Sequence, residues 1–242
     1  MATPSITLYL DIVSPFSYIA FHVLRNSPVF SQCNITYVPI FLGGLMSACS
    51  NTPPVKIKSK TRHDLNSEMT SELTLLGVNS DKDIWINQQR LRWARAFSVP
   101  MSERVPEGFP VLTLTTQRAL CAISEKRPDQ LAPVIEALYR AFWLDRDSKI
   151  GQPEGFGPVL EKVLGQAETQ DILQAINQTE IKSLLTSNTD QAFKSGAFGL
   201  PWFECTNANG QTEGFWGIDH LGQVADFLDL NRQAEQGFRS LL

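Results

Sequence analysis

The chain has 242 residues, of which 43% are hydrophobic, enough for a sizeable core in one large domain or one domain carrying an insertion. Its 21 basic and 25 acidic residues give a net charge of −4, so we expect no nucleic-acid partner. No apolar run approaches the roughly 20 residues that span a bilayer, and we expect no membrane association. The N-terminal residues resemble neither a secretory signal nor a transit peptide. We therefore expect an intracellular, cytoplasmic protein, with mitochondrion and peroxisome as alternatives.

The first 50 residues predict a strand, a helix and a second strand. Residues 6–10 are apolar and strand-like, residues 15–25 form an apolar helical run, and residues 35–40 combine alternation with β-branched side chains. Such a βαβ unit implies two parallel strands joined by a right-handed crossover.

The middle of the chain, from Thr52 to about residue 185, shows mainly helical patterning. Strand signals are nearly absent there. Helices are predicted over residues 83–97, 116–126, 130–144 and 153–163, and another over residues 179–194.

Strand signals return near the C-terminus. Residues 198–205 predict a strand led by proline, and Asn209-Gly210 favours a tight hairpin turn to a partner strand over residues 212–216. A last helix is predicted from His220 to about residue 230. The order βαβ, helical block, then αββα indicates an α/β fold in which one sheet is interrupted by inserted helices.

The four cysteines, Cys33, Cys49, Cys121 and Cys205, show no Cys-x-x-Cys spacing. With only three histidines, the sequence offers no zinc-like cluster, and we predict no metal site. Free cysteines of intracellular proteins usually pack as small apolar residues. We therefore expect four reduced, mostly buried thiols.

The tetrapeptide Ser14-Pro15-Phe16-Ser17 lies between the first predicted strand and helix. Such a turn directs backbone N–H groups and a helix N-terminus at one point, where negative charge is stabilised. In thioredoxin-like redox proteins this turn carries Cys-x-x-Cys, whereas both positions are serine here. The turn could therefore hold a thiolate but not supply one. On the tetrapeptide alone, the simpler interpretation is that Ser14 and Pro15 start a helix, as its N-cap and its first helical residue.

Four motifs occur in order along the chain. They are Asp11-x-x-Ser14-Pro15-Phe16-Ser17-Tyr18, Asn51-x-Pro53-Pro54, Gly196-x-Phe198-Gly199-Leu200-Pro201 and Trp216-Gly217-x-Asp219. Together they resemble kappa-class glutathione transferases and the related glutathione-dependent 2-hydroxychromene-2-carboxylate isomerases, on the DsbA-like branch of the thioredoxin fold. The resemblance implies a thioredoxin-like domain of residues 1–50 and 186–242, interrupted by an all-helical domain of residues 51–185.

The resemblance assigns roles around bound glutathione. Ser14 matches the catalytic serine, whose hydroxyl would donate to the glutathione sulfur and lower its pKa. Leu200-Pro201 matches a cis-proline site whose backbone pairs with the cysteinyl unit of glutathione. Asp219 matches an aspartate that accepts from the γ-glutamyl ammonium. The family has serine before this aspartate, so Ile218 can offer only its backbone N–H. Locally, Pro201 also suits an edge strand or turn, and Asp219 suits a helix N-cap.

Two further contacts are implied. Asn51 matches the family's asparagine, although asparagine is also a common turn residue. A family lysine falls on Lys60 when counted from Asn51, but on Lys82 when counted back from the following helix, and we prefer Lys82. Either lysine could equally be a solvated surface charge. The extra residues 62–80 are expected to border the second-substrate pocket.

The sequence therefore predicts a kappa-like glutathione transferase that activates the glutathione thiolate for attack on a small apolar electrophile. The resemblance implies a homodimer, a role in detoxification and scope for isomerase or peroxidase activity. One alternative is a glutathione-dependent cis–trans isomerase of an aromatic or polyketide-like acid, in which glutathione is regenerated. A second alternative is a protein that binds glutathione or another thiol without catalysis. A dithiol oxidoreductase is not expected, since neither Ser14 nor Ser17 has a sulfur.

Overall fold

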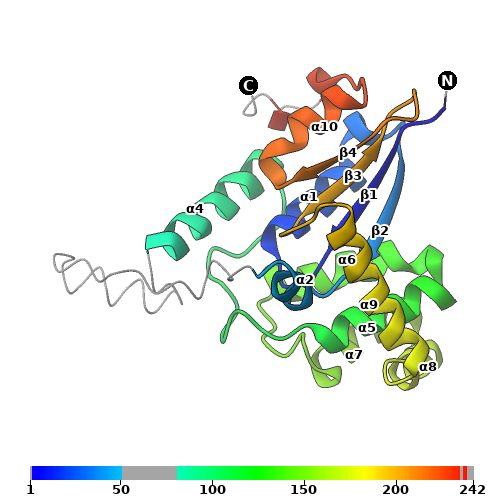
Figure 1. Ribbon diagram of the computed structural model, residues 1–242. Helices are drawn as coiled ribbons and strands as arrows, with labels where there is room; N and C mark the ends of the chain where they lie inside the picture. The colour runs from blue at the N-terminus through cyan, green and yellow to red at the C-terminus, as the bar shows by residue number, and fades with distance from the viewer. Residues whose placement is uncertain (1, 51–80, 235–236, 239–242) are drawn as a thin grey trace, which may run out of the picture.

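The computed structural model describes residues 2–50, 81–234 and 237–238 (Figure 1). Residues 2–50 contain β1 (Ser5–Leu10), α1 (Pro15–Asn26), β2 (Asn34–Pro39) and α2 (Leu42–Ala48). The helices that follow are α4 (Asp81–Ala96), α5 (Leu114–Lys126), α6 (Pro128–Trp143), α7 (Pro153–Leu164), α8 (Gln166–Ala175) and α9 (Thr179–Lys194). The C-terminal part holds β3 (Trp202–Thr206), β4 (Thr212–Trp216) and α10 (Leu221–Phe227).

One mixed sheet joins the two ends of the chain, with strand order β2-β1-β3-β4. β1 runs parallel to β2 and antiparallel to β3, where Tyr9 lies beside Trp202. β3 and β4 form the predicted hairpin, and Gly210 in its turn has a φ of 79°, a conformation that glycine adopts at little cost. The predicted α/β fold, with βαβ and ββα parts in one sheet, is confirmed.

Successive side chains of a strand point to opposite faces of the sheet, and those of β1 enter two different apolar clusters, one on each face. Leu8 and Leu10 belong to the larger apolar cluster, which also contains side chains of α1 and α10. Tyr9 belongs to a smaller cluster with Leu45 of α2 and Ala192 of α9. The ends of β1 and β3 are thereby fixed from both sides.

The helices α5, α7, α8 and α9 gather beside the end of the sheet where β1 and β2 finish (Figure 1). Their apolar side chains continue the larger cluster, and Tyr139 of α6 stacks on Tyr18 of α1 with ring centroids 4.9 Å apart. The boundary predicted near residue 185 falls inside α9, and the division into two domains stays a prediction. No helix of the described segments is both long and apolar enough to cross a membrane.

Several expectations about individual elements were wrong. The strand predicted over residues 198–205 begins only at Trp202, since the Leu200–Pro201 peptide bond is cis and proline cannot donate to a ladder. Neither α2 nor α8 was predicted. The last helix is preceded by a separate 3-10 turn, Ile218–His220, and ends at Phe227 rather than near residue 230. The Phe109–Pro110 bond, in a segment read simply as a loop, is also cis.

Candidate functional site

Ser14 lies where the chain leaves β1 and begins α1, and its side chain is almost completely buried. It is the N-cap of α1, with Pro15 as the first helical residue, and its Oγ accepts a hydrogen bond from the Ser17 N–H at 3.2 Å. A hydroxyl has one hydrogen to donate and two lone pairs with which to accept. Capping therefore occupies a lone pair and leaves the Ser14 hydrogen available to a ligand.

The backbone just before Ser14 is held by side chains of α6. The Asp11 carbonyl accepts from the Ser14 N–H at 3.0 Å and from the Tyr139 hydroxyl at 3.3 Å. The Ile12 carbonyl accepts from Trp143 Nε1 at 3.0 Å. The two side-chain bonds come from α6, so the turn is fixed from outside the βαβ unit as well as by its own Ser14–Asp11 backbone bond.

The Asp11 side chain forms a buried network that the sequence did not reveal. Its carboxyl oxygens accept from the Val13 and Leu42 N–H groups, the Thr113 hydroxyl and the Gln117 amide. Burial raises the pKa of this carboxyl group, and the four hydrogen bonds oppose that rise. The only signal in the sequence was the place of Asp11 at the head of the Ser14 motif.

Leu200 and Pro201 form a cis peptide bond, as the resemblance predicted. They directly precede β3, whose Trp202 pairs with Tyr9, so this loop lies at the same end of the sheet as the Ser14 turn. Within the described residues, the N–H and C=O of Leu200 have no hydrogen-bond partner. Unpaired backbone groups of a poorly exposed residue suit a strand-like ligand.

The segment Gly217–Asp219 lies next to the cis-proline loop, because the Gly217 N–H donates to the Pro201 carbonyl at 3.0 Å. Ile218 is buried, whereas the Asp219 side chain is 64% exposed. Asp219 lies within the 3-10 turn, so it is not the N-cap of the last helix. Its carboxylate lies 3.5 Å from His220 Nδ1 and faces solvent, where it can meet a cationic group.

The remaining predicted contacts are not placed by the structure. Asn51, Lys60 and the segment 62–80 lie outside the described residues. Lys82 belongs to the first turn of α4, and its side chain also lies outside what is described. α4 packs against α1, the helix that begins at Ser14. The choice between Lys60 and Lys82 stays a prediction.

Three of the protein's own thiols are poor candidates for the nucleophile. All four cysteines are free, with Cys33 and Cys49 half-buried and the other two buried. Burial raises the pKa of Cys121 to about 12 and also raises the pKa values of Cys33 and Cys205. Because neither Ser14 nor Ser17 carries sulfur, a thiolate at the hydroxyl of Ser14 is expected to come from a ligand.

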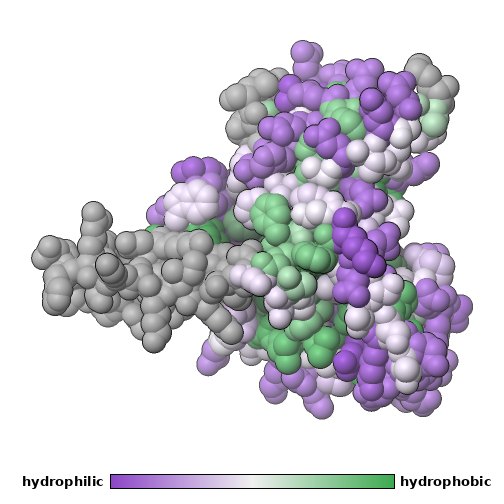
Figure 2. Space-filling model, in the orientation of Figure 1, coloured by the Kyte–Doolittle hydropathy of each residue, from purple (hydrophilic) through white to green (hydrophobic). Residues whose placement is uncertain are grey.

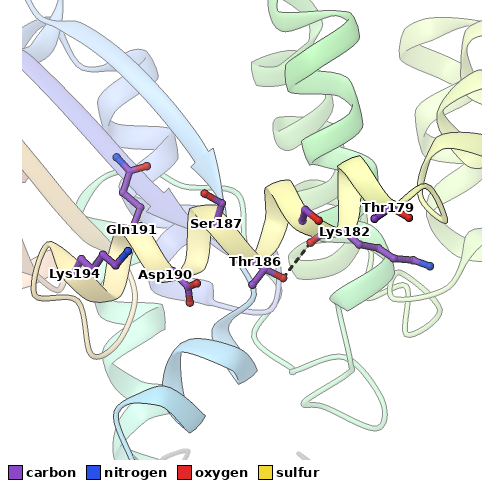
Figure 3. A pocket seen from close by; sticks show the side chains of 8 residues that line it. Thr179, Lys182, Thr186, Ser187, Asp190, Gln191 and Lys194 are labelled. Atoms are coloured by element: carbon purple, nitrogen blue, oxygen red, sulfur yellow. Dashed lines mark hydrogen bonds between the residues drawn. The ribbon is translucent and has the colours of Figure 1, made fainter.

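A large hollow of about 600 Å³ lies elsewhere, along α9 (Figure 3). Its lining is polar and comes from a single helix. Figure 3 shows that Ser187 and Gln191 point away from Thr186 and Asp190, so these side chains do not converge on a common point. We therefore place the candidate site at the Ser14 turn, where groups from β1, α1, β3 and β4 meet.

A family model described as a DSBA-like thioredoxin domain matches residues 5–229. The chain belongs to the DsbA-like thioredoxin family. Within that family it is similar to glutathione S-transferase kappa 1 of Rattus norvegicus, at 28% identity over 91% of this chain and 89% of the relative. It is 24% identical to 2-hydroxychromene-2-carboxylate isomerase of Sphingobium xenophagum, over 93% of this chain and 98% of the relative.

The fold of this DsbA-like protein also matches a solved structure. A 2-hydroxychromene-2-carboxylate isomerase superimposes with a TM-score of 0.69 and 18% identity, over 93% of this chain and 94% of the other. The likeness to kappa-class transferases and this isomerase that the motifs suggested is confirmed by these relatives. It supports a glutathione-related transferase or isomerase as the broad class of this protein.

Proposed function

We propose that the protein is a kappa-like glutathione transferase in which Ser14 stabilises the thiolate of bound glutathione. The observation that carries this proposal is the hydrogen bonding of the Ser14 hydroxyl. Its oxygen accepts from the Ser17 N–H, and its hydrogen remains available at the N-terminus of α1. A hydrogen bond to the charged form and a helix N-terminus both lower a thiol pKa.

The neighbouring loops suit the rest of the tripeptide. Leu200 offers an unpaired N–H and C=O to the cysteinyl backbone. Asp219 offers an exposed carboxylate to the γ-glutamyl ammonium, with the Ile218 N–H as a donor to the carboxylate at the same end of glutathione. Asn51 and Lys82 are proposed as additional contacts. These donors and acceptors match glutathione in kind: a thiolate, a peptide backbone and a zwitterionic end.

In the proposed reaction the protein activates the thiol of glutathione and does not itself bond to the acceptor. Glutathione supplies a nucleophilic sulfur, which forms a carbon–sulfur bond as a leaving group departs with its electron pair. Ser14 raises the fraction of thiolate near neutral pH, and the bonds from α6 hold the turn in position. We propose that the acceptor is a small apolar electrophile.

Apolar surface supports that choice of acceptor. Figure 2 shows such surface in the middle of one face, around α2, whose first N–H group is bonded to Asp11 near the Ser14 turn. Leu112, next to Thr113, is 62% exposed, and Phe198, two residues before Leu200, is 43% exposed. Large exposed apolar side chains near a polar catalytic group are typical of a site that binds an apolar substrate.

The test compares the two serines of the turn. Replacing Ser14 by alanine should lower kcat/KM for conjugation of glutathione to a model aryl halide by roughly 100-fold, as loss of one preorganised donor does in other enzymes. Ser17→Ala is the matched control, because Ser17 is fully buried and the variant keeps the backbone N–H that bonds to Ser14. Glutathione binding, measured by calorimetry, should survive in both variants.

Unchanged turnover in Ser14→Ala would remove this role from Ser14. Glutathione affinity without turnover in the wild type would instead favour a non-catalytic binding protein. Sedimentation of the wild type would test the homodimer that we also propose.

An isomerase is the second candidate, because the Sphingobium xenophagum relative is covered over 98% of its length. Product stoichiometry separates the two reactions. Conjugation consumes one glutathione per product, whereas isomerisation of an aromatic or polyketide-like acid returns it. Glutathione remaining constant during turnover would select the isomerase.

A further inference from the structure

Asp11 is the buried group at which the Ser14 turn meets α2 and the start of α5. Its Oδ1 accepts from the Val13 N–H at 3.1 Å, the Thr113 hydroxyl at 2.7 Å and the Gln117 amide at 2.7 Å. Its Oδ2 accepts from the Leu42 N–H at 2.9 Å. The side chain is fully buried. One carboxyl group therefore fixes three segments that are distant in the sequence.

The N-termini of α2 and α5 lack side-chain cap hydrogen bonds, and each has a group bonded to the Asp11 carboxyl instead. Thr113 is the N-cap of α5, and threonine commonly caps with its own hydroxyl, yet here that hydroxyl makes no cap bond and donates to Asp11. The N-cap of α2 is Phe41, which has no polar side chain, and Asp11 accepts the Leu42 N–H in its place. The usual N-terminal capping of both helices is thus replaced by hydrogen bonds to Asp11, beside the Ser14 turn.

The same residue is bonded to Ser14 through the backbone. The Ser14 N–H donates to the Asp11 carbonyl, and Val13, which lies between them, donates to the Asp11 carboxyl group. A displacement of Asp11 would therefore move the residue whose hydroxyl is to meet a sulfur atom. Misplacement of a catalytic group by about 1 Å can cost a large fraction of its effect.

Direct electrostatics does not account for an acidic group at this place. A negative charge close to an anion site raises the pKa of a thiol and so works against a thiolate. A neutral Asp11, which its burial favours, would leave the thiolate without any charge-based support from this residue. The contribution of Asp11 must then lie in the geometry that its hydrogen bonds impose.

We propose that Asp11 is a positioning residue that sets the Ser14 hydroxyl in place by tying the turn to Leu42 of α2 and to Thr113 at the start of α5. This inference rests on the proposed function, because it concerns the residue that would hold the thiolate. It also makes α2 and α5 part of the site, because their hydrogen bonds to Asp11 contribute order to Ser14.

Two buried threonines provide a matched test. Thr113 donates to Asp11 at 2.7 Å, and Thr116, in the first turn of α5, donates to the Ile150 carbonyl at 2.7 Å. Both are buried, so Thr113→Val and Thr116→Val each remove one buried hydrogen bond of the same length. The two variants should lose similar amounts of thermal stability, and only the first loses a bond to Asp11.

The measurements are the pKa of the glutathione thiol bound to the full-length protein, from thiolate absorbance in the ultraviolet, and kcat and KM for conjugation. Thr113→Val should raise the bound thiol pKa and lower kcat roughly tenfold, with KM for glutathione unchanged. Thr116→Val should match the wild type in all three. Amide hydrogen exchange at Val13 and Leu42 should be faster in Thr113→Val only.

Asp11→Asn gives a stronger second variant. Asparagine keeps one oxygen but directs an NH₂ group at one of the donors, so its kcat should fall further than that of Thr113→Val. If this variant does not fold, the threonine pair still decides. Equal thiol pKa and kcat in Thr113→Val and Thr116→Val would overturn the inference alone. A wild-type protein that shows no thiolate signal with glutathione would overturn the proposed function and this inference with it.

Discussion

The turn around Ser14 and the loop around Asp219 lie at the same end of the sheet, but they are held in different ways. Ser14 as a whole residue is 5% exposed, and the residues just before it receive hydrogen bonds from α2, α5 and α6. The Asp219 side chain is 64% exposed, and its loop is tied to the cis-proline segment by the Gly217–Pro201 backbone bond. Stabilisation of a developing charge requires preorganised groups, whereas recognition of a charged ligand end can rely on an exposed partner.

The most direct test of the difference between the two regions is to place a thiol at the rigid Ser14 turn. In Ser14→Cys, the introduced sulfur would sit at the N-terminus of α1, where thiol pKa values fall well below the ordinary value. We expect it to react with iodoacetamide roughly 100-fold faster than Cys121 or Cys205, whose pKa values are raised by burial.

Ser17→Cys is the control, since that position is fully buried within α1. Mass spectrometry of the alkylated peptides reads both rates. Equal reactivity at the two positions would show that the turn does not favour a thiolate.

The exposed loop should affect binding rather than chemistry. Asp219→Asn removes the charge that is proposed to meet the γ-glutamyl ammonium, and it should weaken glutathione binding about tenfold, or about 1.4 kcal/mol. The pKa of the bound thiol should not change. Calorimetry measures the affinity, and Glu213→Gln, an exposed carboxylate on β4, serves as the control. A raised thiol pKa with unchanged affinity would reverse the roles assigned to the two regions.

A smaller effect should appear in the pH dependence of stability. Burial raises the pKa of Asp11, so this group favours the folded state most below its unfolded pKa of about 3.9, and that contribution is lost as pH rises through the folded pKa. Tyr139, which faces the Asp11 carbonyl, stays neutral in this range because burial raises its pKa well above the usual value.

The free energy of unfolding should therefore fall in the wild type relative to Asp11→Asn as the pH rises above about 4. Urea unfolding at several pH values gives this difference. A difference that is constant or grows in favour of the wild type would contradict the raised pKa.

Much of the fold could be predicted because periodicity and turn residues act locally. α9 matches its predicted range, β4 does too, and β1 begins one residue early. α2 escaped prediction because Gly43 and Gly44 weaken its helical pattern and its first N–H is satisfied by Asp11, 31 residues away. α8 is a 10-residue helix that follows directly after Gly165, at the end of α7, where the sequence shows only a stop.

In the candidate site, too, some features could be predicted from the local sequence and others could not. The cap at Ser14 follows from two adjacent residues, whereas the cis bond at Pro201 followed only from the resemblance, since most proline bonds are trans. The Asp11 network was out of reach, because Thr113 and Gln117 lie 102 and 106 residues from their acceptor. Hydrogen bonds over such separations depend on tertiary packing, which no local pattern encodes.

The central claim is that the Ser14 turn stabilises a thiolate that the protein does not itself carry. The most direct measurement is an ultraviolet titration of glutathione bound to the wild type and to Ser14→Ala. We expect the bound thiol pKa to lie at least about one unit below the ordinary thiol value of about 8.5 in the wild type, and to return toward it in Ser14→Ala. The same thiol pKa in both proteins would contradict the account.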